Sequence, residues 1–208
     1  MKIKAVIFDV GGVLIRTEDH SHRRKLEQEL GLTPGESELL VFDSEAGQKS
    51  QRGEITDDEK WHWIARKLNL DSAGLRHFQK MFWAGDKLDT TLVNYIRSLR
   101  PRYQTAIISN APDNLRYILT KHYPILDAFD LVVCSAEEKV MKPNPLIYQR
   151  TLVRLGRQPE ETVFIDDSLP NVQAARALGI HAVHFRPGIH VPDELEKLGI
   201  VTQKVTKG

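Results

Sequence analysis

The sequence predicts an α/β protein: a Rossmann-like parallel sheet with helices on both faces, plus an inserted helical cap. Three observations lead to this prediction. A short apolar run, residues 5–8, opens the chain, and similar runs alternate with amphipathic helical stretches from about residue 85 onward. Such alternation is typical of a parallel sheet with right-handed crossovers. Between these two parts lies a block that carries only helical patterning.

The first predicted strand covers residues 5–8, because Ala-Val-Ile-Phe suits a strand that is buried on both faces. Asp9 follows at its carboxyl end, where open α/β sheets bind their ligands. Gly11 and Gly12 come next and allow a tight turn with close approach of the backbone to a ligand. Taken alone, this stretch fits a capping or turn aspartate equally well.

The helical block is assigned to residues 16–84, which leaves residues 1–15 and 85–208 as the core. Its helix signals are Asp19 or Ser21 before a helix closed by Gly31, and capping boxes at Thr33 to Glu36 and Thr56 to Glu59. Trp61, Trp63 and Phe82 are predicted to form the core of this bundle rather than a ligand cage. An insertion after the first strand would lie over the ligand crevice as a lid.

Four further strands are predicted in the second part of the chain, at residues 105–108, 131–134, 162–165 and 182–185. Helices are expected before, between and after them, at residues 92–99, from Pro112, and at 145–155, 170–178 and 192–198. The single cysteine, Cys134, falls in a predicted strand and is expected to be a small buried hydrophobe. One cysteine also excludes an internal disulfide framework.

Polar residues follow four of these strands: Asp9, the pair Ser109-Asn110, Lys142, and the pair Asp166-Asp167. Each alone is ordinary, as a helix cap, a surface lysine or an acidic turn. Together, at the carboxyl ends of parallel strands, they predict one site. Several carboxylates in one crevice need a cation, and hard oxygen ligands suit Mg²⁺. An aspartate, a lysine and a hydroxyl beside Mg²⁺ suit phosphoryl transfer.

These segments resemble the motifs of the haloacid dehalogenase (HAD) superfamily, and the match covers most of the chain outside the insertion. The resemblance implies that Asp9 is the nucleophile, that Ser109 and Lys142 act with it in catalysis, and that Ser109, Asn110 and Lys142 bind substrate. It also implies a Mg²⁺ site built from Asp9, the backbone of Gly11, Asp166 and Asp167, with Asn171 as a supporting polar residue. Met141-Lys142-Pro143 and residues 164–179 are most similar to capped phosphatases related to glucose-1-phosphatases.

The sequence departs from the family pattern at Gly11, where a second aspartate usually protonates the leaving oxygen. The metal ligand at that position is normally the backbone carbonyl, so glycine removes the proton donor and can keep the metal site. Such acid–base help is worth about 10²–10⁴-fold in rate. Two hypotheses follow: the enzyme favours good leaving groups, or Glu18, Asp19, His20 or a metal-bound water replaces the donor.

The predicted function is hydrolysis of small phosphate monoesters, sugar phosphates among them, through an aspartyl-phosphate on Asp9. Gln48 and Arg52 in the insertion are the expected specificity residues. One alternative is a metal-independent haloacid dehalogenase, against which the acidic pair Asp166-Asp167 argues. The other is a HAD fold that has lost catalysis and binds a partner, for which Gly11 is the best argument.

The composition limits the kinds of binding partner that are expected. The formal net charge is +1 and the pI is about 7.9, so neither nucleic acid nor an anionic membrane is expected as a partner. The sequence carries no signal peptide or membrane-span pattern, which together with the single cysteine predicts a cytoplasmic protein. The eight histidines show no metal-ligand spacing. Oligomeric state is not indicated.

Overall fold

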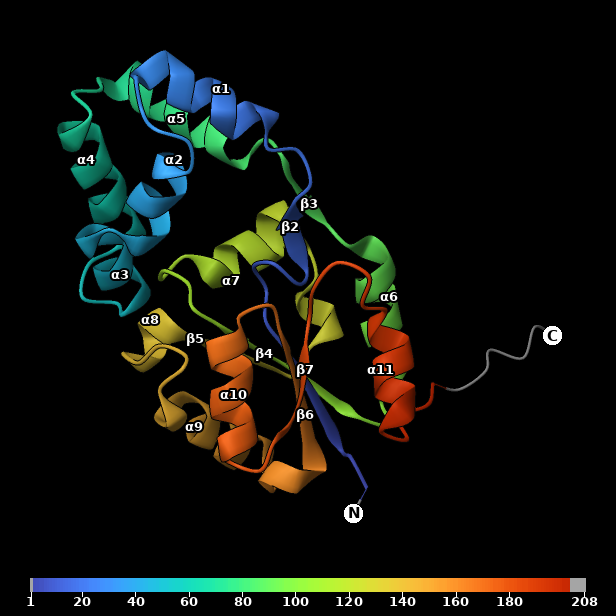
Figure 1. The fold of residues 1–208 in the computed structure, drawn as a ribbon. Helices are drawn as coiled ribbons and strands as arrows, with labels where there is room; N and C mark the ends of the chain where they lie inside the picture. The colour runs from blue at the N-terminus through green and yellow to red at the C-terminus, as the bar shows by residue number, and fades with distance from the viewer. Residues whose placement is uncertain (1, 203–208) are drawn as a thin grey trace.

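A five-stranded parallel sheet forms the centre of the molecule (Figure 1), in a computed structural model that describes residues 2–202. The strand order is β5-β4-β1-β6-β7. Their bounds are β1 Ala5–Phe8, β4 Gln104–Ser109, β5 Leu131–Cys134, β6 Thr162–Asp166 and β7 His181–His184. The predicted α/β class is therefore confirmed, and β1 lies in the middle with a neighbour on each side.

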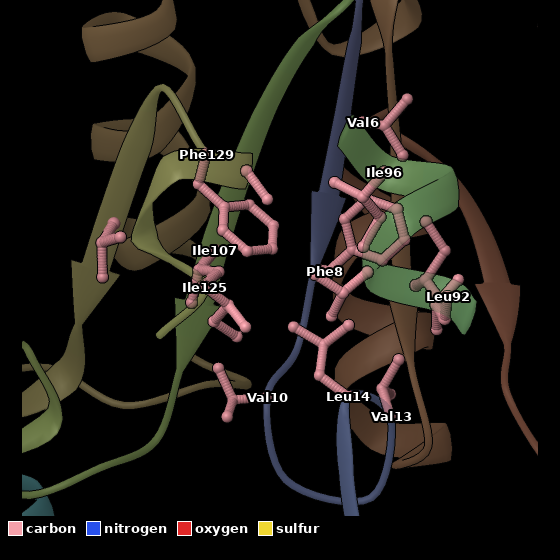
Figure 2. Packing of buried hydrophobic residues seen from close by; sticks show 14 of the residues in the cluster. Val6, Phe8, Val10, Val13, Leu14, Leu92, Ile96, Ile107, Ile125 and Phe129 are labelled. Atoms are coloured by element: carbon pink, nitrogen blue, oxygen red, sulfur yellow. The ribbon is translucent and has the colours of Figure 1, made fainter. Parts of the chain in front are cut away.

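Residues of β1 alternate between the two faces of the sheet, as a strand buried on both sides requires. Val6 and Phe8 pack on one face with Leu92 and Ile96, as Figure 2 shows. Ala5 and Ile7 belong to the opposite core. All four residues are buried, so the strand that carries Asp9 is fixed from both sides.

Helices cover both faces. On the Phe8 face lie α6 (Thr90–Leu99), α7 (Leu115–Tyr117) and α11 (Val191–Lys197), and on the Ile7 face lie α9 (Pro145–Leu155) and α10 (Leu169–Ala177). Short elements complete the core: α8 (Ser135–Glu138) and 3₁₀ turns at Leu126–Ala128 and Pro159–Glu161. Pro145 at the start of α9 and left-handed Gly156 at its end explain why its predicted bounds are correct.

The insertion after the first strand is helical, as predicted, and lies beyond the upper end of the sheet in Figure 1. Its helices are α1 (Ser21–Leu30), α2 (Glu36–Glu38), α3 (Glu45–Gln51), α4 (Asp57–Lys67) and α5 (Ser72–Trp83). Trp61 and Phe82 are buried in its own small core, and Trp63 packs against that core. The capping box predicted at Thr56 and Glu59 is present.

Two strands join the insertion to the sheet domain, and the sequence pattern did not predict them. β2 (Ile15–Thr17) and β3 (Asp86–Leu88) pair antiparallel, with Arg16 opposite Lys87. Each strand has only three residues, so its alternation of apolar and polar residues is too short to be recognised in the sequence. The insertion therefore enters and leaves through one narrow ribbon; the domain boundaries at 15/16 and 84/85 stay a prediction.

Two helix starts were predicted wrongly. The helix expected from Thr33 begins at Glu36, because Gly35 takes a left-handed conformation (φ 84°). Half of the capping box still forms, since the Thr33 N–H donates to Glu36 Oε2 at 2.9 Å. The helix expected from Pro112 begins at Leu115, after a turn in which the Leu115 N–H donates to the Pro112 carbonyl. Both helices continue as five-residue π-helices, Leu39–Asp43 and Ile118–His122. The start at Asp19 or Ser21 falls within one residue of the observed start, with His20 as the N-cap.

Cys134 is fully buried, as expected, and burial raises the pKa of its thiol. Within residues 2–202, none of the helices combines the length and apolar character that a membrane span requires.

Candidate active site

The four polar strand ends meet at the carboxyl edge of the sheet. Parallel pairing sets Phe8 level with Ile107 of β4 and with Ile165 of β6. Asp9 therefore follows β1 at the level where Asp166 ends β6. Ser109 ends β4 and is buried, like Asp9 and Asp166. The register of adjacent strands is what brings together Asp9 and Asp166, which are more than a hundred positions apart in the sequence.

Lys142 lies between two of the carboxylates. Its Nζ is 2.8 Å from Asp9 Oδ1 and 2.6 Å from Asp166 Oδ2. The Lys142 side chain is 1% exposed and that of Asp166 is fully buried. Burial acts to lower the pKa of Lys142, but the two carboxylates outweigh it and raise this pKa. The ammonium is therefore a permanent positive charge between Asp9 and Asp166.

Asp166 is held by a complete set of donors. Besides Lys142, the Ser168 N–H donates to its Oδ1 at 2.8 Å, and the Asn171 side-chain amide donates to both oxygens at 3.1 and 3.2 Å. Tyr148 in turn donates its hydroxyl proton to the Asn171 carbonyl at 3.1 Å. Asn171 thus has the supporting position that the sequence predicts for it.

The carboxyl group of Asp9 has a raised pKa in this site. Burial, together with the charges of Asp166 and Asp167, raises its pKa to about 7 even though Lys142 opposes the shift. The Val10 N–H donates to its Oδ1 at 2.7 Å and fixes the carboxylate. A carboxyl group with this pKa is half ionised near neutrality, and any further cation placed beside it would favour the charged form.

The donor set fits a divalent cation. Oxygens of Asp9, Asp166 and Asp167 lie within 4.8 Å of one another. Burial, and then the charge of Asp166, raises the pKa of Asp167, as expected for acids that are close together. No backbone N–H of the described residues donates to the Gly11 carbonyl, so this oxygen keeps its capacity to act as a ligand. Hard oxygen donors of this kind suit Mg²⁺.

The two glycines differ in what they permit. A Cβ at Gly12 would lie 2.1 Å from Asp167 Oδ2, and the backbone there has φ +72°, so only glycine fits against that carboxylate. A Cβ at Gly11 would meet nothing within 4 Å. The departure from the family pattern at Gly11 therefore leaves open space and is not forced by packing.

A cavity of about 1620 Å³ opens above this cluster, between the sheet edge and the insertion. Gly11, Ser109 and Asp167 line it from the core. Asn110 lines it too, but its side-chain amide is occupied by two hydrogen bonds with the Lys142 backbone, at 2.8 and 2.9 Å. Asn110 therefore positions the loop of Lys142; one N–H and one lone pair of its amide remain, so its contact with substrate stays a prediction.

Gln48 and Arg52, the predicted specificity residues, do not line the cavity. Gln48 donates to the Asp43 carbonyl and Arg52 pairs with Glu54. The cavity is instead lined by Gly47 and Gln51 of the same helix. Residues four apart share a helix face, so the helix lines the cavity through Gly47 and Gln51, and Gln48 and Arg52 lie on another face. Of the three proposed substitute donors, only His20 lines the cavity.

Comparison with known proteins assigns the family. A family model described as haloacid dehalogenase-like hydrolase matches residues 3–179. The chain belongs to this family. The resemblance read from the motifs is thereby confirmed at the level of the superfamily; the more specific similarity to glucose-1-phosphatases is not among the findings.

Relatives of this HAD-like hydrolase match most of its length. It is 26% identical to the sesquiterpene phosphatase astK of Aspergillus oryzae, over 94% of this chain and 96% of that one. It is 26% identical to the D-ribitol-5-phosphate phosphatase of Bacteroides thetaiotaomicron, over 89% and 92%. A HAD family enzyme of the same bacterium, solved with magnesium and inorganic phosphate, superposes with a TM-score of 0.77 at 24% identity, over 90% and 96%.

Proposed function

We propose that this protein is a Mg²⁺-dependent phosphatase that hydrolyses small phosphate monoesters through an aspartyl-phosphate on Asp9. The observation that carries the proposal is the contact of Asp9 with Lys142 at 2.8 Å, beside two further carboxylates within 4.8 Å. One ammonium cannot neutralise three carboxylates, so the cluster is completed by a divalent cation. The proposal includes residues 16–84 as a cap over the site and a cytoplasmic location.

In the first step, an Asp9 oxygen attacks phosphorus, the bond between phosphorus and the leaving oxygen breaks, and that oxygen takes a proton from solvent, since Gly11 carries no acid. In the second step, water attacks phosphorus and gives up a proton to solvent, and the bond to Asp9 breaks, which regenerates the carboxylate. Lys142 offsets the negative charge of the phosphoryl group during transfer. The Ser109 hydroxyl and the backbone N–H of Asn110 donate hydrogen bonds to that group. Since the buried residues around Asp9 hold these groups in place, catalysis is largely positioning and electrostatics.

Asp9, Asp166, Asp167 and the Gly11 carbonyl would hold Mg²⁺. When bound, the cation screens the carboxylates from the phosphate and polarises it. A relative solved with magnesium and phosphate supports this choice of metal.

The proposal is tested by phosphate release from a panel of phosphate monoesters, with and without a chelator. We expect release that stops when Mg²⁺ is removed and resumes when it is restored. Chloride release from a 2-chloro acid that continues in the chelator would instead identify a dehalogenase. Absence of both activities, with Mg²⁺ still bound, would favour a binding protein that has lost catalysis.

Mg²⁺ affinity should fall as the pH is lowered through 7. The pKa of Asp9 is raised to about 7 in the metal-free protein, and the metal binds the ionised carboxylate, so protons compete with it below that pH. From this pKa we expect binding about tenfold weaker at pH 6 than at pH 8. Calorimetric titration at both pH values, in buffers of different ionisation enthalpy, measures the affinity and the released proton. An affinity independent of pH would remove Asp9 from the ligand set.

Restoring the missing carboxylate should change the leaving-group dependence. Gly11→Asp places an acid where a Cβ meets nothing within 4 Å, so the change should fold normally. We expect kcat for esters of poor leaving groups to rise by about 10²-fold, the lower range of acid–base catalysis, and kcat for acyl phosphates to stay unchanged. Gly11→Ala is the matched control, since it adds the Cβ without the acid. Equal rates for both variants across the series would contradict the hypothesis.

The relatives are named for substrates with two kinds of alcohol, one hydrophilic and one apolar. One relative is named for ribitol phosphate and another for a sesquiterpene. Sugar phosphates, one class of monoester expected from the sequence, are hydrophilic, as are polyol phosphates, whereas a terpene alcohol is apolar. The composition of the cavity bears on this choice.

A further inference from the structure

Aromatic side chains that are left exposed gather in the cavity. Among the described residues, the large exposed hydrophobic side chains include three aromatic ones: Phe42, Trp83 and Tyr117, at 37%, 40% and 60% exposure. All three line the cavity above Asp9. The exposed aliphatic residues, such as Leu39 and Val153, do not. Phe42 and Trp83 are in contact with each other, and apolar surface that remains exposed in this way marks a binding site.

The aromatic wall on the insertion side is rigid before any ligand arrives. The Trp83 ring lies 6.0 Å from Phe42 and 4.7 Å from Phe82, in edge-to-face contacts. Trp61, which also lines the cavity, is 6.5 Å from Trp83. Since these rings already support one another, little side-chain entropy is lost when an apolar group binds against them.

Both π-helices deliver residues to this cavity, one from each side. Phe42 lies in the first, which the Ser44 N–H closes on the Leu39 carbonyl at 2.7 Å. Tyr117 directly precedes the second, which the Tyr123 N–H closes on the Ile118 carbonyl at 2.9 Å. π-helical turns are rare and occur frequently at functional sites. Here each turns an aromatic ring toward the same space.

Charges in the cavity lining are mostly neutralised within it. Arg16 pairs with Asp89, Arg23 with Asp86 and Lys60 with Asp57, at 2.6–2.9 Å. The lining holds two other lysine or arginine residues, Lys80 and Arg186, and both are exposed. Uncharged polar side chains, such as Gln51, Gln79 and Asn114, also line the cavity, while the closed ion pairs do not suit a second buried anion.

We infer that the substrate is the phosphate monoester of a bulky apolar alcohol, whose hydrocarbon lies between Trp83 and Phe42 of the insertion and Tyr117 of the core. The inference rests on the proposed function and specifies its substrate class. The cavity of about 1620 Å³ exceeds the roughly 300–1,000 Å³ common for small-ligand pockets. A sugar phosphate would leave much of the aromatic wall in water, whereas a long hydrocarbon would cover it.

The test measures kcat/KM for ethyl, hexyl and decyl phosphate and for ribitol 5-phosphate. The alkyl phosphates are used below their critical micelle concentrations. We expect kcat/KM to rise along the alkyl series, by up to about fourfold for each methylene, which corresponds to ~0.8 kcal/mol. Hexyl phosphate should exceed ribitol 5-phosphate. The non-hydrolysable alkyl phosphonates, titrated by calorimetry, should follow the same order in affinity and give a readout that does not depend on turnover.

Trp83→Ala and Tyr117→Ala should each lower the ratio of kcat/KM for decyl phosphate to kcat/KM for ethyl phosphate. The expected decrease is at least fivefold, which corresponds to about 1 kcal/mol. The ratio of the affinities for the two matching phosphonates should fall as well. Leu39→Ala is the matched control: it removes an exposed hydrophobe from the same π-helix as Phe42 but outside the cavity, and should leave both ratios unchanged.

Three results separate the two proposals. A preference for ribitol 5-phosphate, or ratios that the aromatic variants leave unchanged, would overturn the apolar substrate and leave the phosphatase standing. Hydrolysis of no monoester would remove the phosphatase. In that event, chain-length-dependent phosphonate binding that Trp83→Ala abolishes would still support an apolar ligand, and its absence would overturn that as well.

Discussion

Replacing Asp9 with asparagine should abolish phosphate release, with a loss of about 10⁴–10⁶-fold in kcat, the order found when a nucleophile or its activating partner is removed from a hydrolase. The amide cannot attack phosphorus, and it is a poorer ligand for Mg²⁺. Lys142 keeps Asp166 as a partner at 2.6 Å, so the surrounding pocket should remain intact. Phosphate release under saturating substrate measures the effect.

The thermal stability of Asp9→Asn shows whether its loss of activity comes from unfolding. The pKa of Asp9 is raised from 3.8 to about 7 in the folded protein. For a raised carboxyl pKa, the ionised form costs stability, and that cost grows as the pH rises from the unfolded to the folded pKa. Asp9→Asn should therefore unfold at the same or a higher temperature than the metal-free wild type at pH 7.5. Asp43→Asn, at an exposed site, is the control and should change neither property. Activity within tenfold of the wild type would contradict the role of Asp9.

Replacing Lys142 with methionine should cost both stability and activity. The change preserves much of the side-chain volume but removes the ammonium that contacts Asp9 at 2.8 Å and Asp166 at 2.6 Å. Breaking a buried ion pair by removing one partner costs about 3–5 kcal/mol, because a buried charge is left uncompensated. Loss of a charged group that stabilises the transition state typically lowers kcat about 10²–10³-fold. Urea unfolding and phosphate release measure the two effects.

Mg²⁺ should restore part of the stability of Lys142→Met, since a cation can compensate the same carboxylates. Lys4→Met is the control, because Lys4 pairs with Glu161 at the surface, and it should leave the unfolding midpoint and the rate unchanged. A Lys142→Met protein as stable and as active as the wild type would show that the buried ammonium is not needed.

Most of the sheet was predictable from sequence because four of its five strands, all but β7, are largely buried. Residues 5–8 and 131–134 are continuous apolar runs, and the observed strands have the same bounds. The site followed from the sheet, since parallel strands bring their carboxyl ends to one edge. Asp9, Lys142 and Asp166 are in contact for that reason.

The failures have a common cause: each depends on geometry that a linear pattern does not carry. The ribbon Ile15–Thr17 pairs with residues about seventy positions away and has no alternation long enough to detect. Gln48 and Arg52 were assigned to the cavity because they are polar, whereas the rotation of α3 turns Gln51 there instead. The aromatic wall was missed because Trp83 belongs to both the bundle and the cavity, and because the π-turns that place Phe42 and Tyr117 leave no mark in the sequence.

The most direct measurement is to stop the reaction in acid during turnover and identify the modified residue by mass spectrometry of peptides. The account predicts one phosphoryl group on Asp9, formed only with Mg²⁺, present before the first phosphate is released and missing in Asp9→Asn. Phosphate released at the full rate with no phosphoryl group on the protein at any time, or with the group on another residue, would contradict it.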